Sequence, residues 1–291
     1  MTMTRREWLN RVGSGIALSA ALPVDASMFG QASDASRRGV SLGVQSYSFR
    51  DRPIDAAIAA MQQLGLTTCE LWQGHVEPRG GGRDEMRRWR ETVSLDDFRA
   101  LKEKFDRAKV RVAAYNISFR DDYSEAEIER GFEMARALGA DAVTASASTG
   151  VVPRVASVAA RHKMRVGMHN HSRIDPNEFA TPESFISAMK AGPFIAVNLD
   201  IGHFTAANFD AVAFLQEHHA RIVTLHIKDR KRDNGPNVPF GEGDTPVGPV
   251  LRLLRDRGWA IPANIEYEYK GGDTVEEVRR CLEFCRRELE S

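Results

Sequence analysis

The fold of this 291-residue chain can be read from four short segments: Met168-His169-Asn170-His171, Asn198-Leu199-Asp200-Ile201-Gly202-His203, Leu225-His226-Ile227-Lys228-Asp229 and Asn264-Ile265-Glu266-Tyr267-Glu268. Each follows a short apolar run, of which Phe194-Ile195-Ala196-Val197 is typical. Apolar runs of this length, bounded by polar turns, are typical of parallel strands that are buried on both faces. We therefore expect four parallel strands, each with reactive side chains at its carboxyl end.

One metal-binding side chain stands at each of these strand ends: His169, Asp200, His226 and Glu266. They lie 31, 26 and 40 residues apart in the sequence. A strand with its following helix takes about 25 to 40 residues, so the spacing places one donor on each of four consecutive strands. Carboxylate and imidazole groups that meet at one end of a barrel form a site for a divalent metal ion.

The rest of the chain repeats the same unit. From Val40 onward, strand-like segments alternate with segments of helical periodicity until the C-terminus, with no linker and no change of composition. Eight such units predict a single (β/α)8 TIM barrel over residues 40–291, with its active site on the loops that follow the strands. The rival, a doubly wound open sheet, lacks a glycine-rich phosphate loop after the first strand. The long segment Pro78–Glu91, rich in Gly and Arg, is expected to be a lid, a substrate loop or disordered.

Residues 1–35 are expected to lie outside the barrel. Thr4-Arg5-Arg6-Glu7-Trp8-Leu9 looks like a twin-arginine export signal, and the apolar stretch Ile16–Leu22 follows it. That stretch is far shorter than the ~20 residues of a membrane span. The interpretation predicts a periplasmic or secreted protein without a membrane span; the alternative is an amphipathic helix or a disordered leader.

Composition excludes some partners. Lys plus Arg and Asp plus Glu number 40 each, so the formal net charge is zero. This balance gives no indication of a nucleic-acid partner. Hydrophobic residues at 42% and charged residues at 27% describe an ordinary globular protein. The three cysteines are expected to be mostly buried thiols.

The motifs Asp200-Ile-Gly-His203, His226-Ile-Lys-Asp229 and Ile265-Glu266 resemble those of the xylose isomerase-like TIM barrels, a superfamily of sugar phosphate isomerases and epimerases. Cys69-Glu70-Leu71-Trp72 and Gly74-His75 support the resemblance, which covers nearly the whole chain after residue 40. It implies one divalent cation, bound by a glutamate, an aspartate, a histidine and a glutamate at the ends of strands five to eight. Asp200, His226 and Glu266 match that pattern, whereas His169 stands where the family carries glutamate.

This departure changes the expected chemistry. Two carboxylates and two neutral imidazoles bring a charge of about −2 to the cation instead of −3, which makes the ion a stronger Lewis acid. Imidazole ligands also favour Mn, Zn, Co or Fe over Mg. Because one of the two family glutamates is absent, a symmetric two-glutamate epimerase mechanism is in doubt. His169 is the preferred ligand because it aligns with that glutamate; His171 is the alternative ligand and otherwise contacts the substrate.

Several further strand-end residues are candidates for catalysis or substrate binding. Glu266 could be both ligand and base, with Glu268 as the alternative base. Lys228 could stabilise an oxyanion or donate a proton, or it could only form a salt bridge with Asp229 or Glu268. His171 is a third catalytic candidate. The residues expected at the substrate are His75, His203, Asn116, Trp72 and Glu70, although Glu70 could instead orient a metal ligand.

Four functions fit this sequence. In the first, a metal-dependent isomerase or epimerase removes the proton beside a carbonyl of a keto- or aldo-sugar through Glu266. In the second, a 3-keto-glycoside lyase or hydratase forms the same enolate and expels a β-substituent. Loss of the second glutamate and export both favour the lyase. An endonuclease of the same superfamily and a non-catalytic sugar-binding barrel are the remaining alternatives. A sugar or glycoside is the expected partner, and a homo-oligomer is left open.

Overall fold

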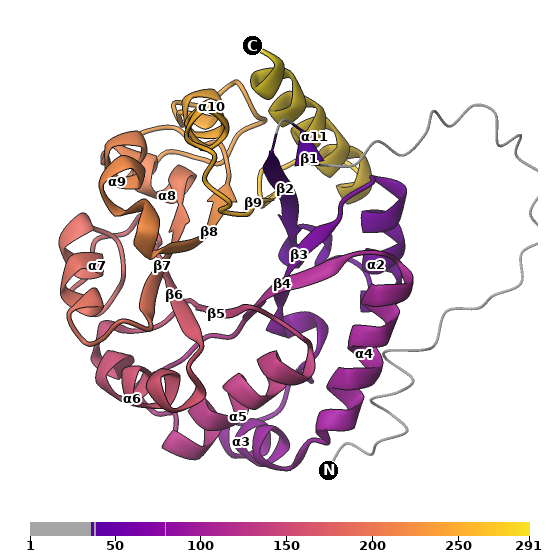
Figure 1. The fold of residues 1–291 in the computed structure, drawn as a ribbon, viewed down its shortest axis with the longest axis vertical. Coiled ribbons are helices and arrows are strands. Elements are labelled where there is room, and N and C mark those ends of the chain that lie inside the picture. The colour runs from indigo at the N-terminus through magenta and orange to yellow at the C-terminus, as the bar shows by residue number, and fades with distance from the viewer. Residues whose placement is uncertain (1–35, 38, 79) are drawn as a thin grey trace, which may run out of the picture.

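The computed structural model describes residues 36–37, 39–78 and 80–291, and these form a closed barrel with helices around it (Figure 1). The eight parallel barrel strands of this described part are β2 (Val40–Gln45), β3 (Thr68–Trp72), β4 (Arg111–Asn116), β5 (Ala142–Ala145), β6 (Arg165–His169), β7 (Ile195–Asp200), β8 (Ile222–Ile227) and β9 (Ala263–Ile265). Each pairs with the next in sequence order, and β9 returns to pair with β2. The predicted (β/α)8 barrel is therefore confirmed.

The helices form the outer ring. They are α2 (Ile54–Gln63), α3 (Arg83–Thr92), α4 (Leu95–Arg107), α5 (Glu125–Ala137), α6 (Val152–His162), α7 (Pro182–Met189), α8 (Ile201–Ala206), α9 (Ala211–His218), α10 (Val247–Arg257) and α11 (Thr274–Glu290). A two-residue strand β1 (Ser36–Arg37) pairs antiparallel with β2. Side-chain caps begin several helices; Ser124, for example, accepts from the backbone of Glu127 and opens α5.

The strands are apolar because both of their faces are covered. In β7, Ile195, Val197 and Leu199 are fully buried, and Asn198 and Asp200 between and after them are buried as well. Alternate residues of a strand point to opposite faces. One set therefore packs against the helices, and the other set, which includes the polar residues, points into the barrel.

The segment Pro78–Glu91 departs from expectation. It was expected to lack regular structure, but α3 occupies most of it. The helix is held by charge pairing with α5 and its neighbourhood. Arg83 donates to Glu127 at 2.6 and 2.7 Å, and buried Arg90 donates to Glu77 at 2.7 and 3.0 Å. Long-range ion pairs of this kind leave no periodic apolar signal in the sequence.

The predicted twin-arginine segment and the leader, residues 1–35, lie outside the described residues. Within the described ranges, no helix combines the length and apolar character that crossing a membrane requires.

The buried carboxylate of Glu127 makes a prediction about stability. Three arginines, Arg83, Arg87 and Arg90, surround it. Although burial alone would raise the pKa of Glu127, hydrogen bonds from Arg83 and the charges of Arg83 and Arg90 hold it below its ordinary value. A Glu127→Gln variant keeps a side chain that can form a capping box but loses the charge. We expect it to lower the free energy of unfolding by about 3 kcal/mol at pH 7.

The difference between the two proteins should depend on pH with a fixed sign. A depressed carboxyl pKa stabilises the folded protein above the unfolded-state pKa, and this stabilisation disappears as the pH falls through the folded-state pKa. Urea titrations at pH 7 and at pH 4 and below should therefore show that the difference in unfolding free energy between the unmodified protein and Glu127→Gln becomes smaller as the pH falls. Glu125→Gln, on an exposed pair with Arg161, is the matched control and should change stability by less than about 1 kcal/mol. A difference in unfolding free energy between Glu127→Gln and the unmodified protein that does not change with pH would contradict the lowered pKa of Glu127.

Candidate active site and metal centre

The ends of β6, β7, β8 and β9 bring four potential metal ligands together. His169 and Asp200 are the last residues of β6 and β7, His226 is the penultimate residue of β8, and Glu266 follows β9. Asp200 lies directly opposite His226 in the sheet register. Ligand atoms of Asp200, His226 and Glu266 all lie within 4.8 Å of one another, and the rings of His169 and His226 are 4.6 Å apart.

Four buried ligand atoms converge here: His169 Nδ1, Asp200 Oδ2, His226 Nδ1 and Glu266 Oε2. Three of them are held by ion pairs, because His226 Nδ1 lies 3.0 Å from Glu266 Oε2 and Lys228 Nζ lies 3.1 Å from Asp200 Oδ2 and 2.8 Å from Glu266 Oε2. His169 Nδ1 has no hydrogen-bond partner among the described residues, and a buried polar atom without one costs about 1–3 kcal/mol. Two imidazole nitrogens and two carboxylate oxygens are suitable ligands for a divalent transition metal. The residues therefore fit the cation that the sequence predicts.

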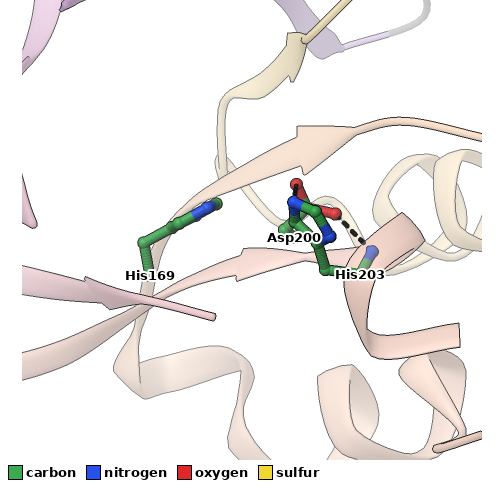
Figure 2. A group of neighbouring side chains, drawn as sticks. All are labelled: His169, Asp200 and His203. Atoms are coloured by element: carbon green, nitrogen blue, oxygen red, sulfur yellow. Dashed lines mark hydrogen bonds and ion pairs between the residues drawn. The ribbon is translucent and has the colours of Figure 1, made fainter. Parts of the chain in front are cut away.

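His203 offers an alternative ligand, because His169, Asp200 and His203 also place donor atoms within 4.8 Å of one another (Figure 2). Both ring nitrogens of His203 are already engaged, however. Its Nε2 lies 3.1 Å from Lys228 Nζ and its Nδ1 lies 2.5 Å from Arg230 Nη1. His169 Nδ1 has no such partner. The geometry therefore favours His169 over His203.

His171 takes a different position from His169, although both follow the same strand. Its side chain is 42% exposed, and its Nδ1 lies 3.5 Å from Glu178 Oε2. The His171 ring is 5.1 Å from that of His169 and lines the cavity. This arrangement suits contact with a bound molecule better than it suits metal ligation.

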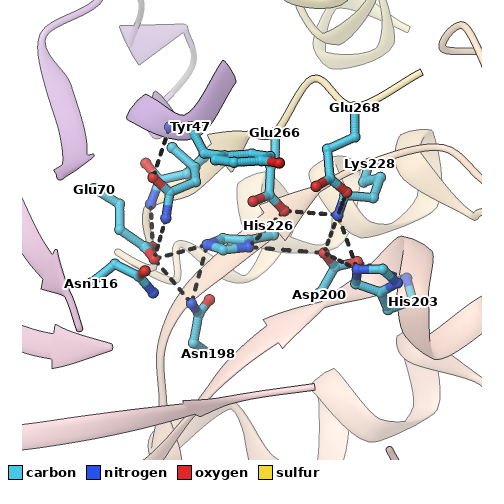
Figure 3. A network of polar contacts seen from close by, with 12 residues as sticks. Tyr47, Glu70, Asn116, Asn198, Asp200, His203, His226, Lys228, Glu266 and Glu268 are labelled. Carbon is cyan, nitrogen blue, oxygen red and sulfur yellow. Dashed lines mark hydrogen bonds and ion pairs between the residues drawn. The ribbon is translucent and has the colours of Figure 1, made fainter. Parts of the chain in front are cut away.

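Glu70 is fully buried inside the barrel, on the other side of the His226 ring from Asp200 and Glu266 (Figure 3). Its Oε1 accepts hydrogen bonds from Gln45 Nε2 at 3.0 Å, Thr144 Oγ1 at 2.7 Å and Asn198 Nδ2 at 3.2 Å, and it lies 2.9 Å from His226 Nε2. Its Oε2 accepts from Asn264 Nδ2 at 3.3 Å. Glu70 thus joins five other strands of the barrel.

The contact between Glu70 and His226 fixes how the imidazole can act. With its Nε2 proton donated to Glu70, His226 presents Nδ1 to Asp200 and Glu266. Burial alone would lower the pKa of His226, but the carboxylates of Glu70 and Glu266 raise it well above its ordinary value. A cation bound at Nδ1 would take over the charge of that proton, so binding is expected to release it.

Lys228 lies on the same side of the site as Glu266. Its Nζ is 2.8 Å from Glu266 Oε2 and 3.1 Å from Asp200 Oδ2, and it also contacts Glu268. Burial opposes its charge, but Asp200, Glu266 and Glu268 raise the pKa of Lys228 above its ordinary value, so it remains an ammonium group. Lys228 and His226 in turn hold the pKa of Glu266 well below its ordinary value, although burial alone would raise it. The salt bridge with Glu268 that the sequence left open is present.

A cavity of about 330 Å³ opens above this centre. Its lining includes nine of the residues that the sequence proposed for the site: His169, His171, His203, His226, Lys228, Glu266, Glu268, Asn116 and Trp72. Glu70 and His75 do not belong to the lining. The ring nitrogens of His75 lie 3.0 Å from Ser46 Oγ and 3.2 Å from the Phe49 carbonyl oxygen, which ties the loop after β2 to the loop after β3. The structure places both residues in supporting positions.

A glycine in the first turn of α8 allows this helix to approach Lys228, the residue after β8, closely. A Cβ atom on Gly202 would lie 2.8 Å from the Lys228 carbonyl oxygen and 3.0 Å from the Lys228 Cβ. Asp200 caps α8 by accepting from the His203 backbone at 2.7 Å. The tight turn between Asp200 and His203 therefore packs directly on the residue that carries the ammonium group.

Sequence reasoning did not assign the polar residues that surround Glu70. Thr144, Asn198 and Asn264 face the barrel interior from β5, β7 and β9. A signal was available, because Asn198 and Asn264 each stand two residues before a proposed ligand and so share its face of the strand. Arg230, which contacts His203 and donates to Ser172 Oγ at 2.8 Å, had no such signal.

The position of Glu70 generates a prediction about metal affinity. Glu70→Gln keeps the shape of the side chain but removes the charge that faces His226 Nε2. Loss of a group that orients a metal-bound histidine typically weakens metal binding 10- to 100-fold, and we expect a change of about that size. Calorimetric titration of the metal-free protein with Zn²⁺ and Mn²⁺ measures it. Glu77→Gln, which removes a buried carboxylate paired with Arg90, is the control and should leave the affinity unchanged.

Replacing His169 tests the choice of metal. His169→Glu adds a carboxylate to the donor set and removes an imidazole, so the preference for Zn²⁺ over Mg²⁺ should fall. We expect the ratio of the two dissociation constants to change by about tenfold or more. His171→Glu is the matched control; a larger change in that variant would identify His171 as the ligand.

Comparison with known proteins agrees with this architecture. The family model of the xylose isomerase-like TIM barrel matches residues 58–288. L-ribulose-5-phosphate 3-epimerase UlaE of Escherichia coli is 30% identical over 98 residues, which cover 33% of this chain and 34% of that protein. The chain therefore matches only about a third of the length of this curated relative.

Two solved structures share the fold. The 3-keto-D-glucoside 4-epimerase YcjR of E. coli has a TM-score of 0.65 at 14% identity and covers 85% of this chain and 99% of its own. The IOLI protein, solved with a zinc atom, has a TM-score of 0.67 at 15% identity and covers 86% of this chain and 98% of its own. Identities this low show the fold alone. The family match extends over most of the chain, and this protein belongs to the xylose isomerase-like TIM barrel family.

Proposed function

We propose that this protein is a divalent-metal-dependent enzyme that removes the proton next to a carbonyl group of a keto- or aldo-sugar and thereby isomerises or epimerises it. One observation carries the proposal: the ionised carboxylate of Glu266 lines the cavity and also lies among the buried ligand atoms of Asp200 and His226. A carboxylate in that position can reach both a cation and a substrate that the cation binds.

The relatives support the reaction class. UlaE is an epimerase of a ketose phosphate and YcjR is an epimerase of a keto-glucoside, so both names describe inversion at a carbon of a carbonyl sugar. Removal of a proton next to a carbonyl is a common route to such an inversion. This chain shares their family or fold, and it has a carboxylate available as the base.

His169, Asp200, His226 and Glu266 would hold the metal ion. When bound, the ion supplies Lewis-acid polarisation of the sugar carbonyl and so makes the neighbouring C–H more acidic. Mn, Zn, Co or Fe is proposed over Mg because two of the four donors are imidazoles.

The protein residues then divide the proton transfer between them. Only Oε2 of Glu266 contacts His226 and Lys228, so Oε1 is available to take the proton from carbon. The electron pair of the C–H bond moves into the former carbonyl group, whose oxygen becomes negative. Lys228 adds positive charge on that side of the cavity and stabilises the oxyanion. Return of the proton by Glu266 to the neighbouring carbon, while the hydroxyl proton there moves to the former carbonyl oxygen, gives the isomer. Epimerisation instead needs a proton from a second acid on the opposite face of the enolate, for which His171 is the candidate in this cavity.

A second reaction, β-elimination from a 3-keto-glycoside, is favoured by the replacement of the family glutamate with His169. The cavity then offers His171, whose Nδ1 lies 3.5 Å from Glu178 Oε2, in place of a carboxylate. An imidazole in that position can protonate a departing oxygen, and the double bond forms as the C–O bond breaks. Release of an aglycone from a 3-keto-glycoside would select this reaction over simple isomerisation.

The proposal is tested through exchange with solvent. Metal-loaded protein incubated with keto-sugars in D2O should incorporate deuterium next to the carbonyl of an isomerised or epimerised product, which NMR detects. Elimination instead removes that hydrogen and is detected by the released aglycone. Glu266→Gln should lower the exchange rate by about 10²- to 10⁴-fold, the usual contribution of a general base. Metal content of the variant is measured in parallel, because the same residue is a proposed ligand.

Glu268→Gln serves as the comparison. The Glu268 carboxylate lines the same cavity but contacts Lys228 and is not one of the proposed metal ligands. The exchange rate of the Glu268→Gln variant should therefore fall far less. A larger loss in Glu268→Gln than in Glu266→Gln would assign the base to Glu268. Full exchange in a metal-loaded Glu266→Gln protein would sink the proposal.

A further inference from the structure

The cavity has two chemically different walls, and the one away from the metal centre carries no charge. Tyr47, Trp72, Asn116, Ser118 and Ser146 form it. The rings of Tyr47 and Trp72 meet edge to face, with centroids 4.9 Å apart. From this wall we infer that the substrate is an uncharged, unphosphorylated sugar or glycoside; the inference rests on the proposed function and names its substrate class.

Lys228 is the one arginine or lysine among the described residues that line the cavity. Its ammonium group contacts three carboxylates, those of Asp200, Glu266 and Glu268. Within this described lining, no cationic side chain is therefore left unpaired for the phosphate dianion of a substrate. A phosphate group brought here would lose its hydration without gaining a charged partner, which is strongly unfavourable.

Two arginines near the mouth, Arg230 and Arg50, are also committed to partners within the protein. Arg230 donates to the Gly235 carbonyl oxygen at 2.6 Å and to Ser172 at 2.8 Å, and it contacts His203. Arg50 donates to the carbonyl oxygens of Tyr47 and Tyr267 at 3.2 and 2.9 Å and stacks on both rings. Bidentate arginine contacts, the strongest recognition of phosphate, would require these bonds to break.

Backbone N–H groups could replace arginine, and TIM barrels often bind phosphate through the loops after their seventh and eighth strands. In this chain those strands are β8 and β9, and a side chain of the protein already fills each position. After β8, the carboxylate of Asp229 accepts from the backbone of Gly241 at 2.8 Å, Gly243 at 3.0 Å and Thr245 at 3.2 Å. Three converging N–H groups form an anion-binding nest, and here the anion is Asp229.

The loop after β9 is filled in the same way. Asp273 caps α11 by accepting from the backbone of Val275 at 3.0 Å and of Glu276 at 3.2 Å. The helix therefore offers its first N–H groups to its own side chain rather than to a ligand.

The glycine-rich loop before α3 provides no substitute. Gly80 and Gly81 have positive φ values of 85° and 98° and precede a helix, as in many phosphate-binding loops. The side chain of Glu85 lies against Gly81, however, and Arg83 is paired with Asp122 and Glu127. A negative group is already present at this helix start.

The uncharged wall is suited to a sugar without phosphate. Hydroxyl and carboxamide groups of Asn116, Ser118 and Ser146 can donate to and accept from sugar hydroxyls, and the aromatic rings of Tyr47 and Trp72 offer apolar surface for the face of a sugar ring. The charged and imidazole groups on the other wall would receive the carbonyl end. The cavity volume of about 330 Å³ falls within the range of small-molecule sites.

Matched pairs of ligands test the inference. A ketopentose, a ketohexose and a 3-keto-glucoside are each compared with their terminal phosphate ester, using calorimetry for binding to the metal-loaded protein and deuterium exchange for reaction. We expect the uncharged member of at least one pair to bind on the order of tenfold or more tightly than its ester. An ester that binds more tightly than its parent sugar in every pair that binds would overturn the inference.

The outcomes separate this inference from the proposed function. Binding of the uncharged sugars without exchange would reject the function and retain the substrate class. Exchange with a preference for the esters would retain the function and reject the substrate class. If none of the six compounds binds, both fail.

An engineered charge gives a second measurement. Ser118→Arg places a cation on the uncharged wall and should shift the binding ratio toward the phosphate esters by about tenfold. Gln63→Arg, on the exposed outer face of α2, adds the same net charge outside the cavity and should leave the ratio unchanged. An equal shift in both variants would mean that overall charge, and not the wall, sets the preference.

Discussion

A single buried carboxylate inside the barrel organises the candidate site. Glu70 is fully buried, so its charge must be met by hydrogen bonds and by His226 from the surrounding strands. Side chains from β2, β5, β7, β8 and β9 supply them. Because these strands are far apart in the sequence, the network forms only when the barrel has closed. The same contacts that satisfy Glu70 also orient His226.

The donor set above Glu70 explains why the centre tolerates a histidine in place of glutamate. Lys228 and a protonated His226 offset only part of the negative charge of Asp200, Glu266 and Glu268. A further carboxylate at position 169 would add negative charge to an already crowded group of acids. His169 avoids that charge, and burial lowers its pKa well below the ordinary value, so that it stays neutral and able to bind a metal.

Much of the fold was predictable because a parallel barrel repeats one pattern. Apolar runs ending in polar residues marked the strands, and their regular spacing indicated eight units. The helix α3 was missed because Arg83 and Arg90 stabilise it through carboxylates up to 44 residues away in the sequence. Such pairings depend on the completed fold and leave no local periodicity.

The candidate site was predictable to a similar degree. Strand-end positions identified the residues that the structure brings together at the cavity, since the carboxyl ends of all barrel strands face one way. They did not distinguish residues that reach the cavity from those that support it. His75 and Glu70 both stand near strand ends, yet one bonds to the backbone of a neighbouring loop and the other lies beneath His226.

The turn at Gly202 has a consequence for how this site can vary. The first turn of α8 packs against the backbone of Lys228. Because Gly202 has no side chain, Asp200 and Lys228 can lie as close together as they do. A side chain at position 202 would collide with Lys228 and would move His203 and Asp200 away from the Lys228 ammonium group. The shortest distance between Asp200 and Lys228 at the barrel mouth thus depends on Gly202, a residue that takes no part in binding.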